Sequence, residues 1–338
     1  MIAIKRAIAT ILAFLNLFFS FATRPGTGDE KKNFRVTSYV VASGVQDESR
    51  LHTEDFDIIT DVILFGCASF DSAGNVNVQR GVLEKALSNL RNVIGERDVQ
   101  IHVNLLGPGP LENYADFEER MKSQGKQHTK AFKSGVLEDN IASLVYEYDF
   151  DGVYFDYEYP LNYVNWTPFN QFLVRLDAKL GEKILGLAVA EWDIKLSLGS
   201  YAAVDRFEVM LYDVYDADGN HATTETVKEL SKKLKQYSIP SNKLDLGLPA
   251  YARPTDKSEY WYEYAKYFDK LDKDGFYRDE RLGKTFRFNR PAEIEEKTRF
   301  AIDNDFGGVM MWHYACDLPS SDPSSLLRAV GKTVSSLG

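Results

Sequence analysis

The chain has 338 residues, of which 44% are hydrophobic and 27% charged, and 50 acidic side chains against 40 lysines and arginines give a net charge of −10. This composition is that of a globular protein with a large core and excludes a disordered or collagen-like chain. The acidic balance argues against a nucleic-acid partner, which needs a basic face, and suits a neutral or cationic ligand.

The first residues have the pattern of a targeting segment. Lys5 and Arg6 precede a mostly apolar stretch that ends in small residues at Ala22. We expect residues 1–22 to be a secretory signal peptide, residues 23–33 a flexible leader, and the protein to be secreted or to lie in the lumen of the secretory pathway. An uncleaved anchor is the alternative, although the stretch is shorter than the ~20 apolar residues of a membrane span. We expect no membrane span in the mature chain.

From residue 34 onward, apolar runs of strand length alternate with segments of helical period. Continuous apolar runs are typical of strands buried on both faces of a parallel sheet. The predicted strands are 34–42, 62–68, 101–106, 152–158, 184–190, 206–212, 243–249 and 307–312. The predicted helices are 82–96, 135–148, 170–181, 223–237 and 291–305, the last opened by Pro291.

Eight strands that mostly alternate with helices predict an α/β fold, a single-domain (β/α)8 TIM barrel over residues 34–338. A short insertion, 252–290, lies between the seventh strand and the seventh helix. A doubly wound sheet is the competing fold, but GPGP at 107–110 lacks the order of a phosphate-binding glycine loop.

Cysteine and histidine usage gives no sign of a metal centre. The two cysteines, Cys67 and Cys316, cannot form a zinc cluster, and the five histidines lack metal-binding spacing. We expect no metal and no cofactor. Whether the two cysteines pair stays open.

The fourth predicted strand, DGVYFDYEYP, carries two acids. Because side chains alternate along a strand, Tyr154, Asp156 and Glu158 face the same side, with the Cα atoms of the acids roughly 6–7 Å apart. In a barrel, chemistry lies at the carboxyl ends of the strands. Neighbouring carboxyls whose pKa values are pushed apart supply a proton donor and an anion, as glycoside hydrolysis requires. The plainer alternative is that both acids cap loops or pair with basic residues.

This strand resembles the DGxDxDxE signature of glycoside hydrolase family 18, the chitinases and endo-β-N-acetylglucosaminidases. Further segments are similar to that family in order and at barrel spacing, and Tyr39 falls where its first strand carries tyrosine. These segments are ILFGCASFDSAGNV (63–76), VMLYD (209–213), LGLPAYAR (246–253) and GGVMMW (307–312). The similarity spans about residues 34–330.

The resemblance implies a retaining, substrate-assisted mechanism, in which the 2-acetamido group of the sugar is the nucleophile. It implies that Glu158 is the general acid, that Asp156 orients the acetamido N–H, and that Tyr212 donates to the acetamido oxygen. The substrate-binding residues it implies are Tyr39, Phe65, Tyr154, Met210, Asp213, Tyr251 and Trp312.

The chain also departs from the family pattern. Tyr154 replaces the middle aspartate of the signature, and we expect its phenol to donate a hydrogen bond to Asp156 and favour the anion. Within the insertion, EYWYEYAKYF (259–268) has aromatics at helical spacing, which predicts a helical packing stripe. Trp261, off that stripe, and Trp192 are candidate sugar-stacking residues. The short insertion implies a shallow, endo-acting site.

The leading hypothesis is therefore a secreted, monomeric glycosidase that cleaves β-1,4-linked N-acetylglucosamine glycans of chitin or N-glycan-core type. The alternative is a catalytically weak or silent carbohydrate-binding lectin of the same fold. Retention of Glu158, Asp156 and Tyr212 favours the enzyme.

Overall fold

The computed structural model describes residues 34–157, 163–192 and 194–336, all in the compact unit that begins at Phe34. The predicted signal peptide and leader, 1–22 and 23–33, lie outside the described residues. The predicted general acid Glu158 also lies outside them.

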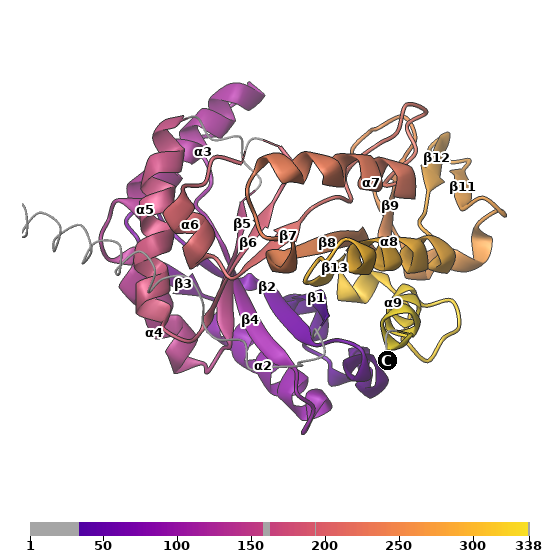
Figure 1. Ribbon diagram of the computed structural model, residues 1–338, viewed down its shortest axis with the longest axis horizontal. Coiled ribbons are helices and arrows are strands. Elements are labelled where there is room, and N and C mark those ends of the chain that lie inside the picture. Colours follow the sequence, from indigo (N-terminus) through magenta and orange to yellow (C-terminus); the bar gives the residue numbers. More distant parts are fainter. Residues whose placement is uncertain (1–33, 158–162, 193, 337–338) are drawn as a thin grey trace, which may run out of the picture. The chain divides into compact units, whose positions relative to one another are not determined.

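Eight parallel strands close into a barrel, which confirms the predicted TIM-barrel fold (Figure 1). The strand order is β1-β13-β8-β7-β6-β5-β4-β2, and pairing of β1 with β2 closes the ring. The barrel strands are β1 (Arg35–Val41), β2 (Asp61–Phe70), β4 (Gln100–Leu106), β5 (Gly152–Tyr157), β6 (Ile184–Val189), β7 (Arg206–Val209), β8 (Leu244–Pro249) and β13 (Gly308–Trp312). A short strand, β3 (Val76–Val78), pairs antiparallel with β2.

The helices lie around the barrel, and all five predicted helical segments are present (Figure 1). The described helices are α2 (Arg80–Ile94), α3 (Phe117–Phe132), α4 (Leu137–Glu147), α5 (Tyr163–Leu180), α6 (Leu198–Ala203), α7 (Thr224–Lys233), α8 (Pro291–Asp303) and α9 (Leu326–Ser335). Four of them begin at a side-chain cap, a hydroxyl or carboxylate that accepts from a backbone N–H of the first turn. The capping residues are Asp116, Ser197, Thr223 and Ser325.

Three of these helices, α3, α6 and α9, were not predicted. The buried face of α3 includes Ser123, Gln124, Gly125 and His128, so its sequence lacks the apolar periodicity that marks a helix. Helix α6 has six residues, fewer than two turns, which is too short to show a period.

The insertion folds as a four-stranded antiparallel sheet in the order β10-β9-β12-β11. Its strands are β9 (Tyr251–Pro254), β10 (Tyr262–Glu263), β11 (Phe276–Asp279) and β12 (Lys284–Arg287). The helix predicted over 259–268 is therefore wrong, since β10 is followed by two short 3-10 helices. Tyr262 stacks on Phe286 of β12 at 4.1 Å and on Tyr267 at 4.5 Å, so contacts across the sheet determine this segment.

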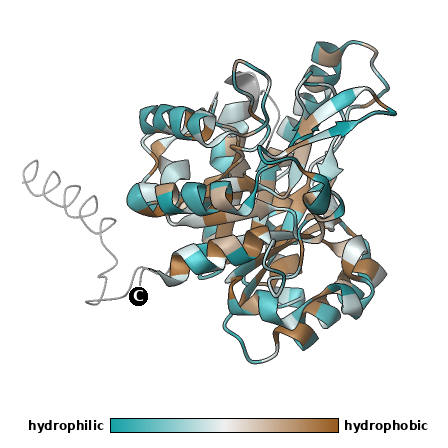
Figure 2. Cartoon of the chain, turned by 90° about the vertical axis from the view of Figure 1, so that its right-hand side faces the viewer, coloured by the Kyte–Doolittle hydropathy of each residue, from teal (hydrophilic) through white to brown (hydrophobic). Residues whose placement is uncertain are grey.

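Hydrophobic residues fill two regions, one between the barrel and its helices and one inside the barrel. Figure 2 shows hydrophobic residues along the barrel strands, whereas the surrounding helices carry both hydrophobic and hydrophilic residues. The interior cluster consists of Tyr39, Ile63, Tyr154, Ala188, Met210, Tyr212, Tyr251 and Met310, with Phe65 and Trp312 packed against it.

Ion pairs occupy the barrel near the amino ends of its strands. Arg35 donates to both carboxylate oxygens of Asp245, at 3.1 and 2.6 Å. Arg206 pairs with Asp61, which also lies 3.0 Å from Nε2 of the buried His102. These contacts satisfy charges that would be costly to bury alone.

The two cysteines do not form a disulfide. Cys67 and Cys316 are both free and buried, so the pairing left open by the sequence does not occur.

Among the described helices, none has the length and apolar character needed to cross a membrane.

Candidate active site

The predicted site residues that the structure describes gather at the carboxyl ends of the barrel strands. Asp156 stands near the end of β5, Tyr212 and Asp213 follow β7, and Trp312 ends β13. Tyr251 begins β9, two positions after the last residue of β8. The fold thus brings together residues that are more than 150 positions apart in the chain.

An aromatic group lines one side of this mouth. The ring of Trp312 lies 5.0 Å from Phe65, perpendicular to it, and 5.2 Å from Tyr39. The register of β2 with β4 shifts between Leu64 and Ala68, and Gly66 has φ +81° there. A bulge of this kind re-aims neighbouring side chains next to a site. Trp312 stays partly exposed, so its face is available to an apolar sugar surface.

Asp213 is an acid of the mouth that several donors hold. Its Oδ1 accepts from Tyr251 Oη at 2.7 Å and from Arg253 Nε at 3.0 Å, and its Oδ2 accepts from Arg253 Nη2 at 2.9 Å. Nε2 of the buried His221 lies 3.4 Å from Oδ1. Burial raises the pKa of Asp213, but His221, Arg253 and Tyr251 outweigh it and hold the pKa well below its usual range.

Tyr251 and Tyr212 form the phenolic wall beside this anion. Both side chains are buried, and their ring centroids lie 6.2 Å apart in an edge-to-face arrangement. Burial, followed by the charge of Asp213, raises the pKa of Tyr251 well above its ordinary value. Tyr251 therefore remains a neutral hydrogen-bond donor.

Tyr154 lies deeper than expected and contacts a different partner. Its side chain is wholly buried, and its hydroxyl accepts from Arg206 Nη1 at 3.5 Å, so the expected hydrogen bond to Asp156 is replaced by one from Arg206. The ring occupies the space above Gly186, where an added Cβ would lie 2.1 Å from Cε1 of Tyr154. A phenol is long enough to reach past Gly186 to the neighbouring strand β7.

A cavity of about 700 Å³ opens beside Asp213. Carboxylates dominate its polar lining, which includes Glu191, Asp216, Glu225 and Glu229, with Lys257 as the cation. The indoles of Trp192 and Trp261 are 48% and 44% exposed. Trp261 stands perpendicular to Tyr251 at 5.8 Å, which places it at the mouth.

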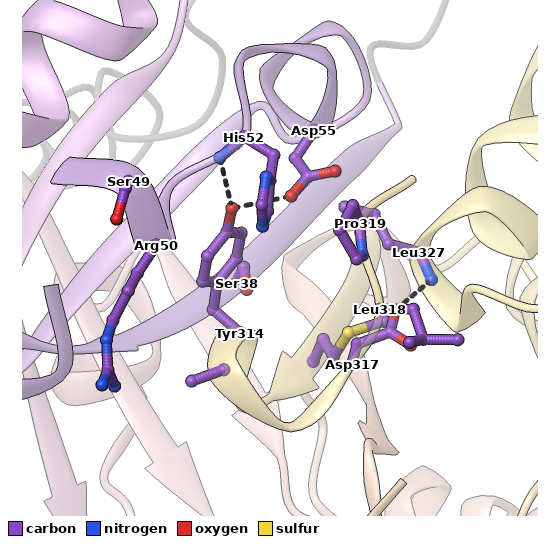
Figure 3. Close-up of a pocket in the computed structure, with 12 residues that line it drawn as sticks. Ser38, Ser49, Arg50, His52, Asp55, Tyr314, Asp317, Leu318, Pro319 and Leu327 are labelled. Carbon is purple, nitrogen blue, oxygen red and sulfur yellow. Dashed lines mark hydrogen bonds between the residues drawn. The ribbon is translucent and has the colours of Figure 1, made fainter. Parts of the chain in front are cut away.

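A second cavity, of about 320 Å³, lies on the outer side of β1 and β13 (Figure 3). Its two carboxylates are engaged in structural contacts. Asp55 accepts from Tyr314 at 2.7 Å, and Asp317 accepts from the backbone N–H of Leu327 at 2.7 Å (Figure 3). Since this second cavity contains none of the predicted site residues, we assign the functional site to the barrel mouth.

The family model described as glycosyl hydrolases family 18 matches residues 35–317. The chain belongs to this family. As a family 18 member, it is a glycosidase. A comparison with curated proteins finds no match.

Solved structures of family 18 chitinases have the same fold. A chitinase of Flavobacterium johnsoniae is 22% identical, with a TM-score of 0.70 over 91% of this chain and 96% of that one. A Bacteroides thetaiotaomicron chitinase is 19% identical, with a TM-score of 0.63 over 89% and 96% of the chains. A Cycas revoluta chitinase variant in complex with (GlcNAc)4 is 15% identical, with a TM-score of 0.67 over 89% and 99%.

Two residues of this family 18 site were not predicted as site residues. Arg253 stands in the LGLPAYAR segment, two positions after Tyr251, and that spacing on a strand was a usable signal. His221 lies in a loop with no motif around it, and only the fold brings it to Asp213. No group of three metal-binding side chains occurs within the described ranges.

Proposed function

We propose that the protein hydrolyses β-1,4-linked N-acetylglucosamine glycans, of chitin or N-glycan-core type, by a retaining, substrate-assisted mechanism. The observation that carries the proposal is the convergence of Asp156, Tyr212, Asp213, Tyr251 and Trp312 at one barrel mouth, within a family 18 chain. Glu158, two positions after Asp156 in the signature, is the proposed general acid.

The first step breaks the glycosidic bond. The proton of Glu158 goes to the glycosidic oxygen, while the carbonyl oxygen of the substrate's 2-acetamido group attacks the anomeric carbon. The leaving glycan departs as an alcohol, and an oxazolinium ion remains. Asp156, as an anion, holds the acetamido N–H, and Tyr212 donates to the acetamido oxygen. Stabilisation of developing charge by fixed groups is the largest contribution that such a site makes.

The second step restores the sugar. Glu158, now ionised, takes a proton from a water molecule whose oxygen attacks the same face of the anomeric carbon that the leaving group occupied. The oxazolinium ring opens and the hemiacetal is released with retained configuration. Asp213, fixed by Tyr251 and Arg253, accepts from sugar hydroxyls, while Trp312 stacks on the apolar sugar face.

The site and the family support the proposed substrate class. The Cycas revoluta chitinase structures are complexes with (GlcNAc)4 and (GlcNAc)3, which supports an N-acetylglucosamine oligomer as the ligand. We further propose that residues 1–22 direct secretion and that the enzyme acts as a monomer. The small sheet of the insertion, in place of a larger domain, supports a shallow site that admits chain interiors.

The test is hydrolysis of a fluorogenic N-acetylglucosamine oligomer by the purified chain and by Glu158→Gln. Loss of the proton donor lowers kcat by about 10²–10⁴-fold. Glu182→Gln, an exposed acid near the amino end of β6, is the matched control and keeps wild-type activity. If the folded wild type binds the oligomer without cleaving it, the carbohydrate-binding lectin replaces the enzyme. If it neither binds nor cleaves, the proposed substrate class is wrong.

A further inference from the structure

Trp261 is a partly exposed indole of the insertion that the proposed mechanism does not use. Its side chain is 44% exposed, and it comes directly before β10. Single exposed hydrophobic residues are common on protein surfaces, so exposure by itself assigns no role. The position of this indole relative to the barrel mouth decides whether it has one.

The pairing of β9 with β10 directs Trp261 to the mouth side of the small sheet. Glu263 pairs with Tyr251 across these antiparallel strands. Because side chains alternate along a strand and paired residues share a face, Trp261 lies on the side of Glu263 and Tyr251. Tyr262 faces the opposite side, where it stacks on Phe286 at 4.1 Å. The sheet thus turns the indole toward the site and the adjacent phenol away from it.

Ring contacts join Trp261 to both aromatic groups of the mouth. Its indole lies 5.8 Å from the ring of Tyr251 at an interplanar angle of 89°, and 6.1 Å from the imidazole of His313 at 66°. His313 in turn lies 5.6 Å from the indole of Trp312. Neither of these two neighbours of Trp261 lies parallel to its indole, so neither is stacked on it. Trp261 therefore continues an aromatic wall that runs from Trp312 to Tyr251.

Polar groups stand on the same side of the sheet as this indole. Arg253 follows Tyr251 by two positions on β9 and so shares its face. Its guanidinium holds Asp213 through hydrogen bonds of 3.0 and 2.9 Å. A pyranose ring offers an apolar face to an indole and hydroxyls at its edge to polar groups. An indole near an arginine–carboxylate pair matches both parts of such a ligand.

We propose that Trp261 is a sugar-binding residue: its indole stacks on another pyranose ring of the glycan that Trp312 binds. This inference rests on the proposed function and extends its binding site from the barrel onto the insertion. Because the wall between the two indoles is continuous, the ligand that reaches Trp261 is the chain that the mouth holds. The insertion thus favours longer oligomers over shorter ones.

The test measures binding without cleavage, in a Glu158→Gln parent that lacks the proposed proton donor. Calorimetry with a series of N-acetylglucosamine oligomers, from the dimer to the hexamer, gives the affinity at each length. We expect Trp261→Ala to bind the hexamer about tenfold more weakly and to lose the rise in affinity at the length that first reaches the indole. Trp261→Phe keeps an aromatic face, and its affinity stays within about threefold of the parent.

Tyr260→Ala is the matched control. Tyr260 is adjacent in the chain and equally exposed, at 44%, but alternation puts it on the far side of the sheet, where Nζ of Lys284 lies 5.3 Å from its ring. We expect Tyr260→Ala to bind every oligomer like the parent. A loss of affinity as large as that in Trp261→Ala would assign the effect to the fold of the insertion and overturn the inference.

Tryptophan fluorescence reports the contact itself. A sugar that stacks on an indole changes its emission, so part of the ligand-induced change in the parent comes from Trp261. We expect this change to be smaller in Trp261→Phe, although that variant keeps its affinity. A merely structural role of Trp261 does not separate signal from affinity in this way, and an unchanged signal contradicts the stacking.

Failure of this inference is distinguishable from failure of the proposed function. If the parent binds the oligomers and folded Trp261→Ala binds each of them equally well, the stacking is overturned while the proposed function stands. If the parent binds no oligomer, the proposed substrate class fails, and the stacking falls with it.

Discussion

The anion at Asp213 illustrates how single side chains define this site. Its carboxylate is fixed by the fork of Arg253 and by the hydroxyl of Tyr251, so one strand of the insertion, β9, and the segment after barrel strand β7 meet at one group. A bidentate arginine contact gives orientation as well as charge. If Asp213 accepts from sugar hydroxyls, as proposed, its direction is set before the substrate arrives.

Arg253→Met tests this arrangement. Charge-assisted hydrogen bonds contribute about 1.5–3 kcal/mol, and Arg253 is partly exposed, so we expect about tenfold weaker binding of an N-acetylglucosamine oligomer at neutral pH. The depressed pKa of Asp213 keeps it ionised in the wild type as the pH falls, whereas loss of Arg253 raises that pKa, so in the variant binding weakens further at a higher pH than in the wild type.

Calorimetric titration from pH 3.5 to 7 measures this affinity. Arg278→Met, an exposed change on β11, is the control and binds like the wild type. Equal affinity of Arg253→Met and the wild type at every pH would show that the arginine contact does not support binding.

At the scale of elements, helix α8 holds the loop that carries His221. Lys297 of α8 is fully buried, and its Nζ donates to the carbonyl of Ala222 at 2.5 Å and to Oδ1 of Asn289. Ala222 has φ +45°, an uncommon conformation for a residue with a side chain. The lysine therefore fixes a strained turn directly beside the imidazole that contacts Asp213.

Lys297 also makes stability depend on pH. Burial lowers its pKa from 10.5 to about 7, so between about pH 7 and 10.5 the unfolded chain binds a proton that the folded chain does not. Stability therefore rises with pH across that window through this group. We expect Lys297→Met to lower the free energy of unfolding by about 1–3 kcal/mol, because two acceptors lose their donor, and to flatten the rise.

Urea unfolding at pH 6.5 to 9.5 measures both effects. Lys232→Met, an exposed change on α7, is the control and keeps the wild-type slope and midpoint. A slope that survives in Lys297→Met would assign the pH dependence to other groups.

The elements that could be predicted from sequence are those whose own pattern determines them. Barrel strands buried on both faces are continuous apolar runs, so all eight were found within a few residues. Helix α3 was missed because small and polar side chains pack inward. The 259–268 segment was mistaken for a helix because its aromatic spacing fits a helical period, although its partners lie on β12.

The residues of the candidate site likewise include some that the sequence could place and some that it could not. Residues within strand motifs, such as Tyr212 and Trp312, could be placed at the mouth because strand alternation and barrel topology fix where they lie. The hydrogen-bond partner of Tyr154 could not be predicted from the sequence, because Arg206 lies on another strand. His221 required the folded loop, since contacts between distant residues leave no local pattern.

At the scale of the whole molecule, the two thiols report on global unfolding. Cys67 lies on β2 and Cys316 follows β13, and both are buried. Burial raises the pKa of Cys67 to about 11 and that of Cys316 to about 12, so neither forms the reactive thiolate near neutral pH.

We expect iodoacetamide to label neither cysteine in the native protein at pH 7.5, and both in urea without added reductant. Labelling followed by mass spectrometry measures this, and a Cys67→Ser variant, with one thiol left, is the control. Fast labelling of the native protein would show that the thiols are accessible and not buried. Absence of labelling in urea would show that the two cysteines are paired.

The packing of Tyr154 against Gly186 has a consequence for the substitutions that the chain tolerates. Because a methyl group at position 186 would overlap the phenol ring, the two positions are not free to change independently. With tyrosine at 154, alanine at 186 requires the ring to move, whereas a smaller side chain at 154 would remove this overlap. A change at either position is therefore constrained by the residue that stands at the other.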